Sequence, residues 1–260
     1  MGKILTDGTG KEIVLALDRI NAVLGGKPRE VCYGFHINGN DSNPSTAVTY
    51  LKDAVGMTPM AMDYASGTFN YGSWGNAFFL PRPCMLRADG TVDYYLDPND
   101  YTQTFDGTPS DVANTEYNGN AMMEWGDGDS IIWMKIVADA NPYSGSVYIA
   151  NYKVDDGFTC YPFINIYGHQ VKHFYTPIYN GSLISGKLRS ISGQTVMKSQ
   201  NATNEITYAK ANYASAEIWN TEVYCDVQLI NMLLILCGKN LNTEIPFGKG
   251  NQSGGSFATA

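Results

Sequence analysis

Two spacings of apolar residues run along this chain, one helical and one strand-like. In residues 11–24, "KEIVLALDRINAVL", apolar positions recur every three or four residues, which predicts an amphipathic helix ended by Gly25. Such a helix must bury its apolar face, either on its own domain or against an oligomer partner or larger scaffold. The second alternative makes four of its residues candidates for assembly: Ile13, Leu17, Ile20 and Leu24.

Short runs rich in aromatic and β-branched residues alternate with turn signals between Val31 and Ala121. In this region "TVDYYL" and "AFFL" are strand-like, and "LRADGTVDYYL" predicts a hairpin with Asp89-Gly90 at its turn. Four later segments are also strand-like: "SIIWMKIVA", "SVYIANYKV", "FINIYG" and "HFYTPIY". We therefore expect many short strands.

Residues 226–238 contain the most apolar run of the chain, in which only Asn231 breaks the apolar pattern from 229 to 237. Asp226 is expected to cap a helix here, and Gly238 suits the position just after its end. The run is shorter than the ~20 residues that a membrane helix needs. It therefore predicts a central helix that is buried all round, without membrane insertion.

A further helix is predicted over 203–219, with Thr203 or Asn204 as its cap. Together these elements predict an α+β fold. We divide it into an N-terminal helix or attachment segment (1–30), a β-rich domain (31–116) and a mixed domain that holds the buried helix (117–260).

Composition and charge narrow the class of protein. Charged residues make up 16% of the chain, below the roughly 25% of typical soluble domains, while Gly (27) and Tyr (18) are plentiful. This mixture is typical of a loop-rich extracellular or virion protein. The net charge is −8 and no cluster of Lys or Arg occurs, so neither nucleic acid nor an anionic membrane is an expected partner.

The five cysteines form no CxxC motif and leave one odd thiol. If one helix joins Cys225 to Cys237, the two lie ~18 Å apart at ~1.5 Å per residue, beyond the reach of a disulfide. We interpret the cysteines as small buried residues of a protein made in a reducing compartment. The first 20 residues carry no cleavable signal pattern, so we expect synthesis in a cytoplasm without Sec-type export.

Motifs for catalysis or metal binding are weak. His169 and His173 have the spacing of a zinc helix, but the motif lacks its Glu and the segment reads as strand and turn. Asp127 and Asp129 fit a tight turn better than a calcium loop, because position 12 of that loop would be Ala138. Nucleophile elbow, phosphate loop and dinucleotide motifs do not occur. We expect no catalytic residue, no metal and no cofactor.

Aromatic residues in a Gly- and Asn-rich segment are the remaining candidates for binding. In "FNYGSWGN" these are Phe69, Tyr71 and Trp74, set among small polar residues that suit adaptable recognition. For each ring the alternative is packing in the core.

The order of several segments resembles a family of phage and prophage tail proteins from Gram-positive hosts. The matching stretches include "YGFHINGNDSNPSTAVTYLKDAVG" (33–56), "FNYGSWGNAFFLPRPCMLRADGTVDYYLDPNDY" (69–101) and "GNAMMEWGDGDSIIWMKIV" (119–137). "VKHFYTPIYNGSLISGKLRSISG" (171–193) and "LINMLLILCGKNLNTEIPFGKG" (229–250) follow in the family's order. The resemblance spans nearly the whole chain, although each motif is loose.

This family is related to the variable proteins of diversity-generating retroelements and has a C-type-lectin-like fold of the formylglycine-generating-enzyme type. The resemblance implies that 117–260 is C-type-lectin-like and incomplete at its C-terminal end. The paired active-site cysteines of those enzymes have no counterpart here, so the resemblance implies their scaffold without their oxidase activity.

We therefore expect a non-enzymatic virion protein, a tail-tip or fibre component that recognises a host-surface glycan or protein. Its expected partners are other virion proteins, further copies of itself and a host cell-surface receptor. One alternative is a purely structural capsid decoration or head-fibre protein. Another is a glycan-acting hydrolase, which needs two carboxylates about 5–10 Å apart across a cleft.

Overall fold

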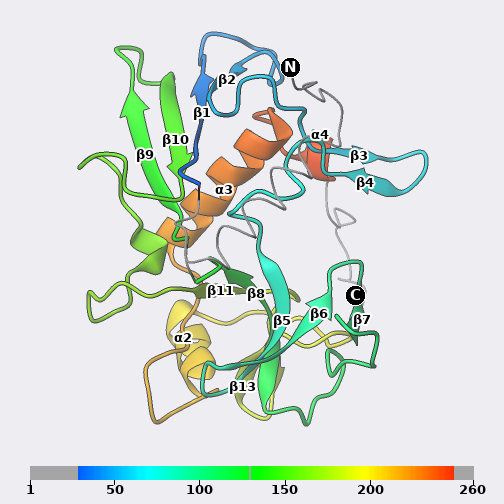
Figure 1. Cartoon of the computed structure of the whole chain (residues 1–260). Coiled ribbons are helices and arrows are strands. Elements are labelled where there is room, and N and C mark those ends of the chain that lie inside the picture. Colours follow the sequence, from blue (N-terminus) through cyan, green and yellow to red (C-terminus); the bar gives the residue numbers. More distant parts are fainter. Residues whose placement is uncertain (1–28, 129, 249–260) are drawn as a thin grey trace.

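A computed structural model describes residues 29–128 and 130–248 (Figure 1). The predicted N-terminal helix, with its assembly residues Ile13, Leu17, Ile20 and Leu24, lies outside the described residues. The described part is a mixed α+β structure in which strands outnumber helices, as the sequence predicts.

A four-stranded antiparallel sheet has the order β2-β1-β10-β9. Its strands are β1 (Cys32–Ile37), β2 (Val48–Lys52), β9 (Trp133–Ala138) and β10 (Gly145–Ala150). β9 and β10 confirm the strands expected in "SIIWMKIVA" and "SVYIANYKV". On β1, β2 and β10 one face carries buried apolar side chains, so this face packs on the core; they are Phe35, Val48, Tyr50, Val147 and Ile149.

A five-stranded sheet has the order β11-β8-β5-β6-β7. Its strands are β5 (Arg82–Arg87), β6 (Val92–Asp97), β7 (Asp100–Thr104), β8 (Gly119–Trp125) and β11 (Phe174–Pro177). Neighbouring strands are again antiparallel, and β11 confirms the strand expected in "HFYTPIY".

The β5–β6 hairpin forms where the sequence predicts it. The Arg87 N–H donates to the Thr91 carbonyl at 2.8 Å, and Gly90 has a φ of +84° at the turn. Glycine adopts this left-handed conformation without the steric cost that a Cβ brings, so the Asp89-Gly90 pair sets the register locally.

Two predicted strands are wrong. Residues 77–80 ("AFFL") form turns, and residues 161–163 of the "FINIYG" region form a 3₁₀-helix, η1 (Tyr161–Phe163), followed by a turn. Phe79 and Phe163 are nevertheless fully buried. Their aromatic character reflects burial in the core, which β-propensity does not distinguish from strand formation.

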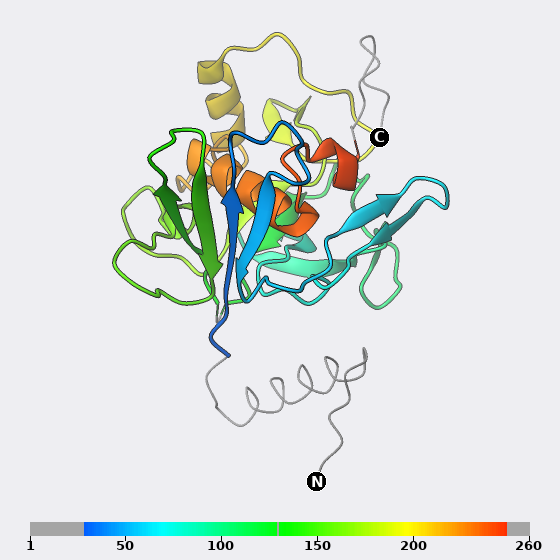
Figure 2. The same ribbon diagram turned by 90° about the horizontal axis from the view of Figure 1, so that it is seen from above.

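Helix α3 (Tyr224–Gly238) packs against the inner face of the four-stranded sheet, and Figure 2 shows it directly behind β1 and β10. The Tyr50 hydroxyl on β2 donates to the Leu236 carbonyl at 2.8 Å and ties sheet to helix. The buried residues of α3 are Leu229, Leu233, Leu236, Cys237 and Gly238.

The prediction that α3 is buried all round is wrong, because Tyr224 and Val227 are exposed. Its ends differ too. Val223 occupies the N-cap position, Asp226 lies in the first turn, and Lys239, rather than Gly238, takes the left-handed cap conformation (φ 48°).

Helix α2 (Ala202–Lys210) is capped by Asn201, whose side chain accepts from the Asn204 N–H, and it ends at Lys210 rather than at 219. Helix α4 (Glu244–Phe247) follows α3 and lies beside β3. Two small hairpins complete the fold: β3 (Ala61–Asp63) with β4 (Thr68–Asn70), and β12 (Ser182–Ile184) with β13 (Lys187–Arg189).

Strands from both predicted domains share both sheets. β1 and β2 pair in one sheet with β9 and β10, and β5 to β7 pair in the other with β8 and β11. The boundary predicted at residue 116 therefore does not separate one sheet from the other. Antiparallel pairing joins segments that are distant in sequence, and local patterns carry no signal of that pairing.

Candidate functional site

A pocket of about 1160 Å³ opens beside the β5–β6 hairpin and the β6–β7 connection. Its walls come from the 71–83 segment, from β6 and from residues 98–111. Five aromatic residues line it: Tyr71, Tyr94, Tyr95, Tyr101 and Phe105. Six polar residues also line it: Arg82, Asn99, Thr104, Asp106, Thr108 and Asp111. Concave, mostly apolar sites with a few polar groups are the usual form of ligand sites.

Tyr94 and Tyr95 are consecutive residues of β6, so their rings lie on opposite faces of the five-stranded sheet, and hydrogen bonds fix each of them. The Tyr94 hydroxyl donates to Asp111 Oδ2 at 2.9 Å and accepts from the Asp111 N–H at 2.8 Å. The Tyr95 hydroxyl donates to Glu124 Oε2 at 2.9 Å. Burial, reinforced by these carboxylates, raises the pKa of both Tyr94 and Tyr95 to about 12, so both phenols keep their protons.

The rim of the pocket is formed by aromatic residues that are more exposed than Tyr94 and Tyr95. Phe105, in the loop after β7, is 78% exposed, and Tyr71 is 46% exposed. Burial raises the pKa of Tyr101, and the neighbouring phenols of Tyr71 and Tyr179 add to this effect. Within the described part of the chain, neither the Tyr71 nor the Tyr101 hydroxyl has a hydrogen-bond partner.

Gly72 holds Tyr71 at this rim. Gly72 has a φ of +56°, and a Cβ there would lie 2.4 Å from the Thr58 carbonyl oxygen. The chain thus passes directly over the Thr58 backbone, which only glycine permits. The same close turn directs Trp74 inward to the core.

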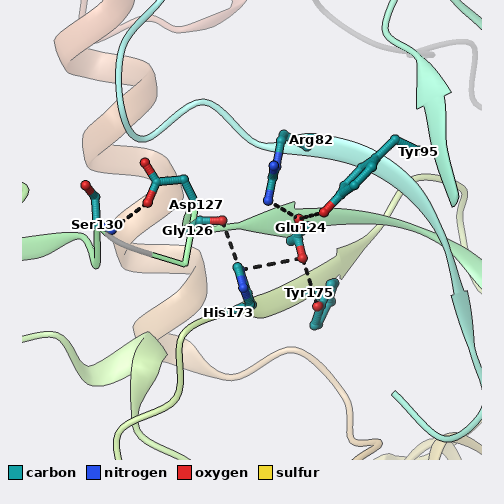
Figure 3. A network of polar contacts seen from close by, with 8 residues as sticks. All are labelled: Arg82, Tyr95, Glu124, Gly126, Asp127, Ser130, His173 and Tyr175. Carbon is teal, nitrogen blue, oxygen red and sulfur yellow. Dashed lines mark hydrogen bonds and ion pairs between the residues drawn. The ribbon is translucent and has the colours of Figure 1, made fainter. Parts of the chain in front are cut away.

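Arg82 connects the pocket to a buried carboxylate (Figure 3). Its Nη2 donates to Glu124 Oε2 at 2.7 Å, and its guanidinium lies 4.7 Å from the centre of the Tyr95 ring. The Glu124 side chain is 2% exposed, whereas that of Arg82 is 45% exposed. The carboxylate therefore fixes one edge of a guanidinium whose remaining donors have no protein acceptor among the described residues.

Glu124 is satisfied on its other oxygen as well. The Tyr175 hydroxyl donates to Oε1 at 3.0 Å, and His173 Nδ1 lies 3.5 Å from the same atom (Figure 3). His173 Nδ1 also lies 3.0 Å from the Gly126 carbonyl, which can only accept, so Nδ1 carries the hydrogen. Arg82, Tyr95 and Tyr175 lie on β5, β6 and β11, so their contacts with Glu124 on β8 join four strands of the sheet.

The two carboxylates of the pocket are held by their own loop. Hydrogen bonds from the Thr104 and Thr108 hydroxyls lower the pKa of Asp106 below its usual value. Asp111 accepts from Tyr94 and from the Asn114 amide at 2.9 Å. Both are placed as hydrogen-bond acceptors, and an Asp with a lowered pKa is a poor general acid at neutral pH.

The structure separates the three aromatic residues predicted to bind a ligand. Tyr71 lines the pocket. Phe69 packs edge-on against Tyr71, with ring centroids 4.9 Å apart, and stacks on Phe247, with ring centroids 5.9 Å apart. Trp74 is 0% exposed in the core, in contact with Tyr33 and Tyr50, so the prediction that it meets a ligand is wrong for this residue.

The sequence analysis missed Glu124, Arg82 and the 98–111 wall. A signal for Glu124 was present, because it is a lone acid in the otherwise apolar strand "AMMEW". A carboxylate in such a position is either exposed or paired, and its burial requires partners. The identity of those partners depends on strand pairing, which the sequence pattern does not give.

Neither a metal centre nor a membrane segment is seen in the described residues. No group of three or more His, Cys, Asp or Glu side chains could hold an ion there. His169 lies in a turn that begins at Asn165, whereas His173 belongs to the Glu124 network. No helix in residues 29–128 and 130–248 is long and apolar enough to cross a bilayer.

All five cysteines lie in the described residues and are free thiols. Cys84, Cys160 and Cys237 are buried, whereas Cys32 and Cys225 are partly exposed. The interpretation of the cysteines as small buried residues thus applies to three of the five.

Comparison of this chain with protein-family models, with curated proteins and with solved structures finds no match.

Proposed function

We propose that this chain is a non-enzymatic virion protein, a tail-tip or fibre component that recognises the surface of a Gram-positive host. The order of its sequence segments supports this setting through the family resemblance. The same resemblance is the basis for proposing that its α+β fold is C-type-lectin-like, with α3 as the core helix.

The observation that carries the recognition role is the open aromatic pocket. The rings of Tyr94 and Tyr95 are held by partly buried hydrogen bonds, while Phe105 stays exposed at the rim of the pocket. Because the two tyrosine rings are fixed in advance, they have little side-chain freedom left to lose on binding. The exposed Phe105 ring buries little surface within its own chain and so adds little to the fold.

The pocket's acids favour binding over hydrolysis. A glycan hydrolase needs one carboxyl group that holds a proton at neutral pH. Asp106 has a lowered pKa because the Thr104 and Thr108 hydroxyls donate hydrogen bonds to it, so it is a poor source of that proton.

Affinity in a virion would come from many copies. A single pocket makes few contacts, and linking several copies in a symmetric oligomer multiplies weak binding without new contacts. The proposed partners are accordingly further copies of this chain, other virion proteins and the host cell-surface receptor.

Cell binding tests this function. Fluorescently labelled protein, pre-assembled on a tetravalent carrier, is incubated with a panel of Gram-positive bacteria and measured by flow cytometry. We expect binding to some strains by the wild type and by Tyr143→Ala, which removes an equally exposed ring outside the pocket. Binding should be lost in Phe105→Ala.

Absence of binding to every strain, together with location of the protein on capsids by immunogold labelling, would contradict the recognition role. That result would favour the capsid decoration alternative. Release of reducing sugar from cell walls would instead favour the hydrolase.

A further inference from the structure

We propose that the pocket binds an uncharged saccharide, with Phe105 and the tyrosines as ring platforms and Arg82 as an oriented hydrogen-bond donor. This inference rests on the proposed recognition function and names the class of ligand at the same site.

The first step is the size and surface of the pocket. About 1160 Å³ is at or above the usual ~300–1,000 Å³ of small-ligand sites. The space therefore suits more than one sugar ring. Aromatic faces such as Phe105 and Tyr71 offer flat apolar surfaces, which match the apolar C–H faces of pyranose rings.

The second step is the mixture of donors and acceptors around those rings. Arg82 offers N–H groups that Glu124 leaves unused, since only Nη2 contacts that carboxylate. The Asn99 side-chain amide makes no hydrogen bond to the described residues, and the Tyr71 and Tyr101 hydroxyls make none either. A sugar hydroxyl donates and accepts at once, so it uses both kinds of group.

The third step is charge. The positive charge of Arg82 is already balanced by Glu124 at 2.7 Å, while Asp106 and Asp111 add negative charge to the wall. An anionic ligand would meet these two carboxylates and a chain of net charge −8. A cationic ligand would find no unbonded carboxylate, because Glu124 is paired with Arg82 and both Asp106 and Asp111 already accept hydrogen bonds from neighbouring side chains. A neutral ligand that forms hydrogen bonds avoids both penalties.

The ring positions are held by elements distant from the rim. Tyr95 is bonded to Glu124, and Arg82 stacks on the Tyr95 ring. Glu124 thus acts as a positioning residue for both pocket groups, while it is itself buried away from the ligand. These contacts hold the Tyr95 ring and the Arg82 guanidinium in fixed positions for binding.

The test uses an array of immobilised oligosaccharides and the full chain on its tetravalent carrier. Uncharged members comprise gluco-, galacto-, manno- and N-acetylhexosamine series, and charged members carry sialic acid or phosphate. We expect binding to at least one uncharged series. Phe105→Ala should weaken it about five- to tenfold, the value of one aromatic contact. Tyr143→Ala should leave it unchanged.

Asn99→Ala probes the polar wall with little risk to the fold, because the Asn99 side chain is exposed and makes no hydrogen bond to the described residues; only its backbone N–H donates, to Asp97. We expect a loss of several-fold with the same sugar preference. Asn118→Ala is the matched change: Asn118 is an exposed asparagine outside the pocket lining whose side chain makes no hydrogen bond to the described residues, and the variant should stay close to the wild type.

Pre-treatment of the cells distinguishes failure of this inference from failure of the proposed function. Periodate destroys sugar diols, whereas proteinase K removes surface proteins. Cell binding that is lost to periodate and survives protease supports a saccharide. Cell binding that is lost only to protease, or array binding confined to charged sugars, overturns the inference while recognition itself stands. No array binding by the wild type also overturns it.

Discussion

Replacing Glu124 by Ala removes the carboxylate on which four strands converge. The side chain is 2% exposed and accepts hydrogen bonds from Arg82, Tyr95 and Tyr175 at 2.7, 2.9 and 3.0 Å. The Ala variant leaves two phenols and a guanidinium without their acceptor, and it leaves a cavity in the sheet.

The size of the effect follows from which charge remains. Removing one partner of a buried pair costs ~3–5 kcal/mol, largely because the other charge is left uncompensated. Here the remaining charge is that of Arg82, whose side chain is 45% exposed and regains water, so the lower end of that range applies. We expect Glu124→Ala to lower the free energy of unfolding by about 3 kcal/mol.

Glu124→Gln keeps the shape and one acceptor oxygen, so its cost should be smaller, about 1–2 kcal/mol. The matched control is Glu217→Ala, an exposed glutamate paired with Lys210 at 3.3 Å, which should stay within about 0.5 kcal/mol of the wild type. Urea unfolding followed by tryptophan fluorescence measures all three variants. An Ala variant within about 1 kcal/mol of the wild type, or a Gln variant that costs as much as Ala, would refute the reasoning.

Three further predictions concern the fold. Gly72→Ala should lower the free energy of unfolding in urea by about 3 kcal/mol, because it combines a positive φ with a Cβ at 2.4 Å from a backbone oxygen. Gly193→Ala, where φ is +73° but the space is open, should lower it by only about 1 kcal/mol. Equal losses for the two variants would contradict the steric argument. Leu236→Ala, at a fully buried site of α3, should lower the free energy of unfolding by about 3 kcal/mol in the same assay. Leu183 is 43% exposed, and Leu183→Ala should lower it by less than about 0.5 kcal/mol. Burial raises the pKa of the Cys84 thiol from 9.0 to about 12, so this group stabilises the fold below pH 9, and that contribution is lost as pH rises from 9 toward 12. In native protein at about pH 8, a thiol reagent should label the two partly exposed cysteines and spare Cys84, whereas rapid labelling of all five would show that the core is open.

The sequence predicts those elements whose signals are local. The β5–β6 hairpin follows from Asp89-Gly90 at its turn, and α3 follows from an apolar run that only Asn231 interrupts. The prediction of the ends of α3 was less accurate. Lys239 adopts the left-handed conformation at the C-terminal end, and tertiary contacts rather than residue preference select it.

Parts of the fold and most of the site depend on contacts between distant segments. Arg82 and Glu124 are 42 residues apart, and the pocket joins Tyr71 to a wall that ends at Asp111. No spacing rule links such positions. Trp74 shows the opposite failure, since an aromatic residue among glycines resembles a recognition loop, yet Gly72 turns the chain so that the indole enters the core.

The measurement that tests the pocket most directly is isothermal titration of the wild type, Phe105→Ala and Tyr143→Ala with the uncharged oligosaccharide that binds best on the array. Both altered residues are aromatic and 78% exposed, and only Phe105 lines the pocket. We predict an affinity five- to tenfold weaker for Phe105→Ala and unchanged for Tyr143→Ala. Equal affinities for all three proteins would contradict the assignment of this pocket as the binding site.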